Sequence, residues 1–215
     1  MLAEVRNQRE IMQDLLDVRP LASARCYQSL PPDFSNMDRL GRVWREKTET
    51  VLERSHAELP PKVLFSVENC ILFGNGHVVL SNGSLIEETI AGSLVTTAPD
   101  FDPASLEVMK GDYALLRKSG DSNYGHWLIE LLPRVIDFHE ALGADVNFIL
   151  PATPVPMLDL RKRSMDLMGV ESERIFPVSA APRIVERLHI ISSNSIHSHT
   201  HDADRLREMV GVVAA

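Results

Sequence analysis

The 215-residue sequence contains only two cysteines, Cys26 and Cys70. Two thiols cannot build a disulfide framework or a zinc site of cysteines, so both are expected to be buried or chemically idle. Long apolar runs are also absent: no stretch of about 18 apolar residues occurs, and no membrane-spanning helix is predicted. The first ten residues carry charge throughout and lack the apolar segment of a signal peptide, so the cytoplasm is the simplest expected location.

Positive charge is scarce as well. Lys and Arg number 22 against 30 Asp and Glu, which gives a net charge of -8 and a pI near 5.5. Binding to a phosphate backbone needs a clustered excess of Lys and Arg, so no nucleic-acid partner is expected. The remaining composition, 44% hydrophobic and 24% charged, is ordinary for a globular protein of one large domain or two small ones.

The first 60 residues predict helices and loops. Apolar positions recur at helical spacing over residues 3–17 and again over residues 37–57, where the pattern ends before Pro60 and Pro61. Between them, residues 19–36 contain Pro20, Pro31, Pro32 and several serines, which is typical of a loop. We therefore expect an N-terminal helical and irregular segment over residues 1–60.

From residue 63 to residue 90 the apolar period changes to two. Asn75-Gly76 and Asn82-Gly83 each lie between short apolar runs. Asn-Gly is a strong hairpin signal because both residues tolerate positive φ. The stretch predicts a small antiparallel β-meander that serves as scaffold, with His77 exposed and inert beside the first turn. Residues 91–110 predict irregular structure.

Strands and helices alternate in the rest of the chain. A strand and a helix are predicted over residues 112–142, a strand-helix-strand unit over 146–192, and a partial C-terminal helix over 204–212. Such alternation predicts βαβ units over a parallel sheet, and so an α/β domain over residues 61–215. Open α/β sheets bind ligands beyond the carboxyl ends of their strands, where the helix of residues 126–142 is expected to begin.

Residues 121–134 carry the most chemistry in the chain. At about 100° per residue, one narrow arc of the predicted helix holds Asn123, His126, Glu130, Arg134 and Asp137, and this arc is expected to face solvent. His126 with Glu130, and Glu130 with Arg134, are i,i+4 pairs, so the carboxylate can reach the imidazole and the guanidinium. The opposite side is expected to be buried and consists of Trp127, Leu128, Leu131, Leu132, Val135, Phe138 and Leu142.

Two further observations bear on how this helix and its polar residues are interpreted. Pro133 removes a backbone donor inside the helix and clashes with the preceding turn, so a kink is predicted there. Purely structural roles also account for the polar residues, because Asn123 or Ser122 can cap the helix and Glu130 with Arg134 can form an ordinary surface pair.

The segment Asn-Tyr-Gly-His-Trp-Leu-Ile-Glu-Leu-Leu-Pro-Arg, residues 123–134, closely resembles the signature of glycosyltransferase family 61. That signature has an Asn, one or two aromatics, His-Trp, an apolar pair around an acidic residue, and Leu-Pro-Arg. Gly125 stands where many members carry a second aromatic, and Glu130 replaces a common Asp. Neither difference removes a group able to transfer a proton. The resemblance covers roughly residues 60–205 and includes the β-meander before the motif.

The resemblance implies the N-terminal, Rossmann-like lobe of a GT-B type glycosyltransferase, with the small antiparallel β-meander before it. It implies inverting transfer of a sugar from a nucleotide-sugar to a hydroxyl of a glycan acceptor, in capsule or surface polysaccharide synthesis. His126 is the expected base and Glu130 the carboxylate that orients it, since an imidazole is suited to proton transfer at neutral pH. Residues expected to position the loop, the acceptor or Glu130 are Asn123, Tyr124, Trp127 and Arg134.

The family holds its nucleotide-sugar in a second lobe, marked by an arginine after a strand and a Gly-Ala-rich segment. Neither feature occurs in these 215 residues, so no cofactor is expected to bind this chain and the nucleotide-sugar enters only as a donor substrate. A second polypeptide or another copy of the chain would supply the missing lobe. Without it the chain is expected to transfer sugar poorly, because an unheld donor forfeits about 7 to 11 kcal/mol of orientation.

Two other functions remain open from the sequence. One is a non-catalytic binding module that keeps the fold. The other is a metal-dependent hydrolase using His197, His199 and His201, which precede Asp202 and Asp204. The order His-x-His-x-His-Asp differs from the usual His-x-His-x-Asp-His of metal hydrolases, so a solvated loop without bound metal is expected.

Overall fold

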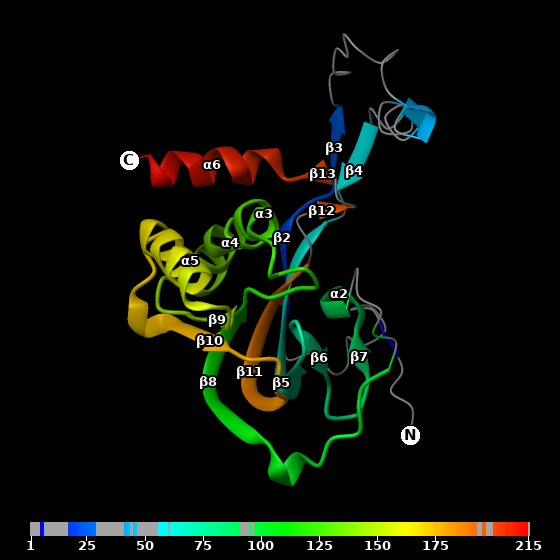
Figure 1. Ribbon diagram of the computed structural model, residues 1–215, viewed down its shortest axis with the longest axis vertical. Coiled ribbons are helices and arrows are strands. Elements are labelled where there is room, and N and C mark those ends of the chain that lie inside the picture. Colours follow the sequence, from blue (N-terminus) through cyan, green and yellow to red (C-terminus); the bar gives the residue numbers. More distant parts are fainter. Residues whose placement is uncertain are drawn as a thin grey trace.

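The computed structural model describes residues 5–6, 17–28, 41–43, 45–46, 56–59, 61–90, 95, 97–192, 195–196 and 200–214. The protein has a mixed α/β fold built on a nine-stranded sheet (Figure 1). Eight of its strands lie in the order β1 (Val5–Arg6), β7 (Leu85–Ile86), β6 (His77–Val79), β5 (Lys62–Phe73), β11 (Arg183–Ile191), β8 (Glu107–Leu115), β9 (Asn147–Pro151) and β10 (Ile175–Val178). The remaining strand, β2 (Asp17–Ala22), pairs with β5 outside this path.

From β7 to β11 the sheet is antiparallel and confirms the predicted β-meander, whereas the short strand β1 pairs parallel with β7. β5 pairs antiparallel with β6, and β6 with β7, across the two Asn-Gly turns. Only the glycine of each pair uses positive φ, 97° at Gly76 and 85° at Gly83. In the second turn the amide of Gly83 donates to Leu80 O and the amide of Leu80 donates to Ser84 O, both at 2.9 Å, which is a three-residue hairpin loop closed by a left-handed glycine.

The prediction of an exposed His77 is wrong. Its side chain is buried, at 5% exposure, with the ring edge-on to Phe73 at 5.2 Å. Neither ring nitrogen has a hydrogen-bond partner among the described residues. The turn wraps tightly around the ring, since a Cβ on Gly74 would lie 2.9 Å from Nδ1. His77 is therefore a core residue that the fold holds neutral.

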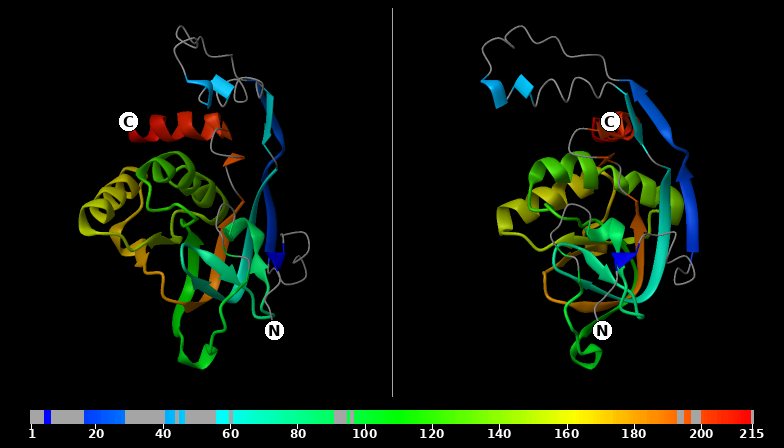
Figure 2. Two further views of the ribbon diagram at one scale, coloured as in Figure 1. Left: turned by 45° about the vertical axis from the view of Figure 1, so that its right-hand side comes forward. Right: turned by 90° about the vertical axis from the view of Figure 1, so that its right-hand side faces the viewer.

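Strands replace the predicted loop at residues 19–22 and 25–28, and residues 29–36 lie outside the described part of the chain. β2 runs antiparallel to β5, with a register shift between Pro20 and Ala22, as befits a proline in an edge strand. β3 (Arg25–Gln28) pairs antiparallel with β4 (His56–Leu59) and extends beyond the main sheet (Figure 2). The loop prediction failed at residues 19–22 because Pro20 lies in an edge strand. The pairing of that strand with the distant β5 cannot be predicted from the local sequence.

The two predicted N-terminal helices are described only in part. Val5–Arg6 form strand β1 rather than a helix, and Asp17 begins β2. Residues 3–4 and 7–16 lie outside the described residues. Residues 42–43 and 45–46 are helical, as predicted, whereas residues 56–57 belong to β4; residues 37–40, 44 and 47–55 lie outside the described part of the chain.

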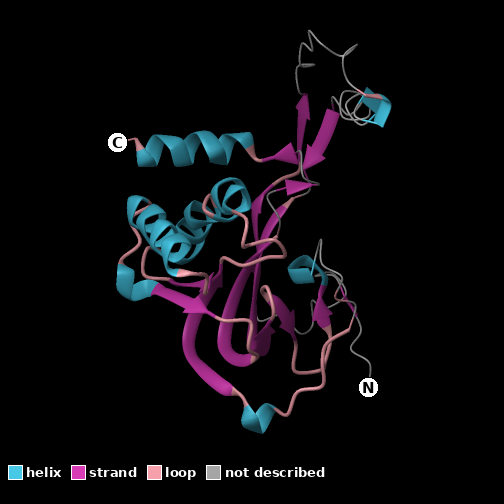
Figure 3. Ribbon diagram, in the orientation of Figure 1, coloured by secondary structure: helices cyan, strands magenta, loops and turns pink. Residues whose placement is uncertain are grey.

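The other half of the sheet is parallel and confirms the predicted βαβ units (Figure 3). β8 is followed by a helical segment over residues 124–142, β9 by α5 (Val155–Leu167), and β10 by β11, which returns beside β8. Beyond β11 come the short strands β12 (Ser195–Ile196) and β13 (Thr200–His201) and the helix α6 (Ala203–Val213). Short helical turns are α2 (Glu87–Ile90), η3 (Pro103–Ser105) and η5 (Ser172–Arg174).

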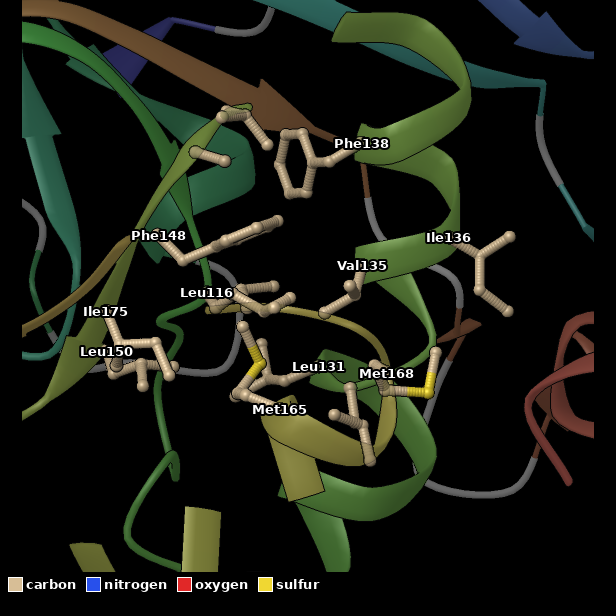
Figure 4. Packing of buried hydrophobic residues seen from close by; sticks show 14 of the residues in the cluster. Leu116, Leu131, Val135, Ile136, Phe138, Phe148, Leu150, Met165, Met168 and Ile175 are labelled. Atoms are coloured by element: carbon tan, nitrogen blue, oxygen red, sulfur yellow. The ribbon is translucent and has the colours of Figure 1, made fainter. Parts of the chain in front are cut away.

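The two faces of the sheet bury different cores, because successive strand residues point to opposite sides. On one face, Phe138 and Val135 of the helical segment pack toward Phe148, together with Leu116 and Met165 (Figure 4). On the other face the curved sheet encloses a core drawn almost entirely from strands, with Phe65, Val67, Tyr113, Leu115, Ile149 and Leu188 among its members. No helix in the described part of the chain is long and apolar enough to cross a membrane.

A buried ion network joins α6 to the body of the protein. The Lys62 ammonium donates to both carboxylate oxygens of Asp137, at 3.1 and 3.0 Å, and to Asp202 at 3.0 Å. Arg205 of α6 donates to Asp137 at 2.9 Å and pairs with Glu140. All residues of α6 are described, and none of them is buried. Charge pairs therefore contribute much of the attachment of α6 to the body of the protein.

We expect Lys62→Met to lower the free energy of unfolding by about 3 kcal/mol, because Asp137 and Asp202 lose the buried cation they share. Urea denaturation monitored by circular dichroism measures the change. Lys110→Met, at an exposed lysine of β8, is the matched control and should shift the free energy by less than about 0.5 kcal/mol. Equal effects of the two substitutions would contradict the assignment.

A second expectation concerns acid stability. Burial lowers the pKa of His77 below its ordinary value of 6.5, Arg117 lowers it further, and Asp121 opposes the shift. The folded protein therefore favours neutral His77, whereas the unfolded chain takes up a proton below about pH 6.5. The stability contributed by neutral His77 is complete above that pH and is lost as the pH falls toward the folded pKa.

Urea denaturation at pH 8, 6.5 and 5 tests this expectation. In His77→Leu the loss of unfolding free energy between pH 8 and pH 5 should be smaller than in the wild type. It should not vanish, because burial also lowers the pKa of His189. An unchanged pH dependence in His77→Leu would refute the role of His77.

Candidate functional site

The candidate site begins in the loop between β8 and the helical segment. Two successive turns shape this loop: the amide of Asp121 donates to Lys118 O at 3.1 Å, and the amide of Asn123 donates to Gly120 O at 2.9 Å. Gly120 has a φ of 79°, a left-handed conformation that favours glycine. The loop turns sharply and presents Lys118 and Gly120 toward the first turn of the helix.

Buried arginines hold this loop in place. Arg117 Nε donates to the Asp121 carboxylate at 3.0 Å, and another nitrogen of the same guanidinium donates to the carbonyls of Val178 and Ser179, each at 3.1 Å. Arg161 of α5 donates to the main-chain carbonyl of Asp121. The loop is thereby tied to the carboxyl end of β10 and to α5, and its conformation follows from the packing of the parallel half of the sheet.

Helical structure starts just after the loop. α3 (Tyr124–His126) is capped by Asn123, whose Oδ1 accepts a hydrogen bond from the Gly125 amide at 2.8 Å. A Cβ at Gly125 would lie 3.1 Å from that oxygen, so the small residue at this position suits the cap. Capping is thus the observed role of Asn123, one of the residues expected to position the loop or the acceptor.

The predicted kink near Pro133 takes the form of a π-helical turn. α3 continues into η4 (Trp127–Leu131), a π-helix, before α4 (Arg134–Leu142) begins with Pro133 as its N-cap. The amide of Leu132 bonds Trp127 O at 2.8 Å, an i→i+5 bond. Pro133 has no amide proton to donate, so the helix changes its bonding pattern just before it.

The polar arc of the helix is buried, which corrects the expectation that it faces solvent. Glu130, Arg134 and Asp137 are all buried, and only His126 and Asn123 keep substantial exposure. The predicted apolar side is confirmed in the core; its fully buried members are Trp127, Leu131, Leu132, Val135 and Phe138. The arc can be buried because each of its charges finds a partner on another element.

Three side chains converge at the helix start. The Nδ1 atom of His126 lies 2.6 Å from Glu130 Oε1, as the i,i+4 spacing predicted. Lys118 Nζ bonds the other oxygen, Oε2. The Glu130 side chain is 2% exposed, against 33% for His126 and 22% for Lys118. A buried carboxylate therefore connects two partly exposed groups that could meet a substrate.

The pKa of Glu130 reflects both partners. Burial acts to raise it, but hydrogen bonds from Lys118 and His126 and the charges of these residues outweigh burial and hold it below its ordinary value. Glu130 is accordingly a carboxylate at neutral pH. Because an ionised carboxylate can only accept a hydrogen bond, the neutral imidazole that contacts it carries its proton on Nδ1, and the Nε2 lone pair is left to accept a proton from another molecule.

The expectation that Arg134 holds the Glu130 carboxylate is wrong in its geometry. Arg134 Nε donates to the main-chain oxygen of Glu130 at 3.0 Å, and Nη1 of the same side chain donates to Ile191 O at 3.4 Å. Burial lowers the pKa of Arg134, and Glu130 and Asp137 partly offset the shift. Arg134 therefore bonds main-chain carbonyls of the helix and of β11. Lys118, and not Arg134, bonds the Glu130 carboxylate.

Trp127 and Tyr124 lie on the core side of the site. Trp127 is completely buried, its Nε1 donates to Ser164 Oγ at 2.8 Å, and the Arg161 guanidinium lies 5.4 Å from the ring centroid. Trp127 therefore anchors the helix to α5 instead of facing an acceptor. Tyr124 is half-buried and packs against the same core.

Among the described residues, no group of three or more His, Cys, Asp or Glu side chains could hold a metal ion. His197 and His199 lie outside the described residues, and His201 belongs to β13. Asp202 caps α6 by accepting from the Arg205 amide at 3.2 Å, and it pairs with Lys62. Burial acts to raise the pKa of Asp202, but Lys62, the Arg205 amide and the charge of Arg25 together outweigh burial and lower this pKa overall.

No family model, no curated protein and no solved structure matches this chain. The likeness of residues 123–134 to the family 61 signature therefore remains a prediction. The physical basis for a function is the site itself: an imidazole at a helix start, a buried carboxylate one turn later and a lysine that pairs with it.

Gly120 provides a test of the site geometry. A Cβ at this position would lie 3.3 Å from Cδ2 and 3.6 Å from Nε2 of His126, so Gly120→Ala should displace the imidazole as well as strain the backbone. Gly169→Ala is a matched control, because Gly169 has a φ of 78° but no atom within 4 Å of its virtual Cβ. Both substitutions should cost about 1 to 2 kcal/mol of stability.

Only Gly120→Ala should also move the ring-proton NMR resonances of His126. Urea denaturation gives the stability changes, and His126→Asn identifies the resonances by their disappearance. Unchanged His126 resonances in Gly120→Ala would show that the ring does not depend on the absence of a side chain at position 120.

Proposed function

We propose that this chain is the N-terminal, Rossmann-like lobe of a GT-B type inverting glycosyltransferase. In this proposal the enzyme transfers a sugar from a nucleotide-sugar to a hydroxyl of a glycan acceptor during capsule or surface polysaccharide synthesis. The observation that carries the proposal is the 2.6 Å contact between His126 Nδ1 and Glu130 Oε1, with the imidazole one-third exposed. The resemblance of residues 123–134 to the family 61 signature supplies the reaction class.

The chemistry requires a base at the acceptor. As the acceptor oxygen bonds to the anomeric carbon, the bond from that carbon to the diphosphate oxygen breaks, and the nucleoside diphosphate leaves with the bonding electrons. The acceptor proton passes to Nε2 of His126. Glu130 holds the imidazole in the reactive tautomer through Nδ1 and stabilises the imidazolium that forms, as a carboxylate does beside a catalytic histidine.

The position of His126 and Glu130, here called the dyad, in the fold supports the proposed function. His126 follows the carboxyl end of β8, in the parallel half of the sheet, where α/β folds bind ligands. The loop that presents it is fixed by the buried Arg117–Asp121 pair, so the base is preorganised. In the proposal, the nucleotide-sugar is held by a further lobe, contributed by a second polypeptide or another copy of the chain.

The experiment uses protein purified from its native host, so that any partner carrying a nucleotide site is retained. The protein is incubated with a panel of UDP- and GDP-sugars and with glycan extracted from the host surface. Nucleoside diphosphate release and labelled product are then measured. His126→Ala should lower kcat about 10²- to 10⁴-fold while the protein stays folded. Glu173→Gln, at an exposed carboxylate in η5, is the control and should leave kcat unchanged.

The configuration of the product provides an independent criterion. NMR of the transferred sugar should show an anomeric configuration opposite to that in the donor. Retained configuration, or undiminished kcat in His126→Ala, would overturn the proposal. Failure of the native preparation to turn over any donor while it still binds the glycan would indicate a binding module instead.

A further inference from the structure

The electrostatics of the dyad depend on how the charge of Glu130 is compensated. The carboxylate is almost completely buried, and an unpaired charge in such a position is strongly destabilising. Among the described residues, two groups are close enough to compensate it: Lys118 at Oε2 and His126 at Oε1. One positive charge is enough to compensate the single negative charge of Glu130. The protonation of His126 is therefore linked to the presence of Lys118.

Other charged groups around the dyad do not take over this task. Arg134 directs its hydrogen bonds at the main-chain oxygens of Glu130 and Ile191. On the loop, Arg117 pairs with Asp121 at 3.0 Å, so these two charges compensate each other. Among the described residues, Lys118 is thus the cation that bonds the Glu130 carboxylate directly, besides the imidazole itself.

We infer that Lys118 is a positioning residue that serves as the permanent counterion of Glu130 and so allows His126 to remain neutral at neutral pH. A base must be unprotonated before it can accept a proton. A buried carboxylate with no other cation would instead retain the imidazole as imidazolium, which cannot act as a base. The catalytic meaning of this role rests on the proposed function, whereas the electrostatic linkage does not.

Removal of the lysine charge provides the test. The protonation midpoint of His126 is followed by the NMR shift of its ring Hε1 proton from pH 5 to pH 9. In Lys118→Met this midpoint should move upward by about one pH unit, because the uncompensated charge of Glu130 lies beside the imidazole and a nearby opposite charge typically shifts a titration by this order. Lys118→Arg, which keeps the charge, should titrate close to the wild type. Lys110→Met, at an exposed lysine, should leave the midpoint unchanged.

A double substitution isolates the cause. In Lys118→Met/Glu130→Gln the carboxylate charge is absent as well, so the upward movement of the midpoint should disappear. If Lys118→Met does not fold, Lys118→Gln takes its place, since the amide can donate to Glu130 without a charge. A midpoint that stays within about 0.2 pH units of the wild type in a folded, uncharged variant would overturn the inference; the threshold corresponds to about 0.3 kcal/mol.

Activity separates this inference from the proposed function. If the native preparation transfers sugar, the acidic limb of its pH–rate profile should move upward in Lys118→Met by the same interval as the NMR midpoint. A shifted midpoint without any transfer activity would uphold the linkage and refute the glycosyltransferase. Transfer activity with an unshifted midpoint and pH profile would refute the linkage alone.

Discussion

The burial of one carboxylate charge constrains the whole site. Glu130 lies within a helix packed against the sheet, where water cannot solvate its charge, so that charge has to be met by neighbouring cations and donors. Lys118 reaches it from the loop after β8 and His126 from the preceding helical turn. Loop conformation, helix start and imidazole orientation are therefore coupled, since each positions a partner of the same buried group.

The coupling extends to the parallel half of the sheet through arginine. Arg117 follows β8 directly and bonds carbonyls at the end of β10, while Arg161 of α5 bonds the loop and lies against Trp127. The hairpin between β5 and β6 also reaches this region, because the Gly74 amide donates to Ala180 O at 2.9 Å. The dyad is thus supported by both halves of the sheet, although its own residues come from one helix.

Local patterns in the sequence predicted the parts of the fold that depend on local periodicity. The β-meander, the alternation of strands and helices after β8, and the His126–Glu130 contact all follow from spacings of a few residues. Lys118 could not be found in this way, because it meets Glu130 across a loop whose turns are not encoded by any periodic pattern. Burial of Asp137 was likewise hidden, since its partners Lys62 and Arg205 lie 75 and 68 residues away.

The pairing of β5 on both of its edges affects how this protein unfolds. Its one edge pairs along most of its length with β11, and its other edge is shared between β2 near Lys62–Ser66 and β6 near Ile71–Phe73. None of β2, β6 and β11 can therefore detach without exposing amides of β5, whose apolar residues also line both cores. Native-state hydrogen exchange should find the slowest amides in this strand, exchanging only when the whole domain opens, so β5 marks the cooperative centre of the molecule.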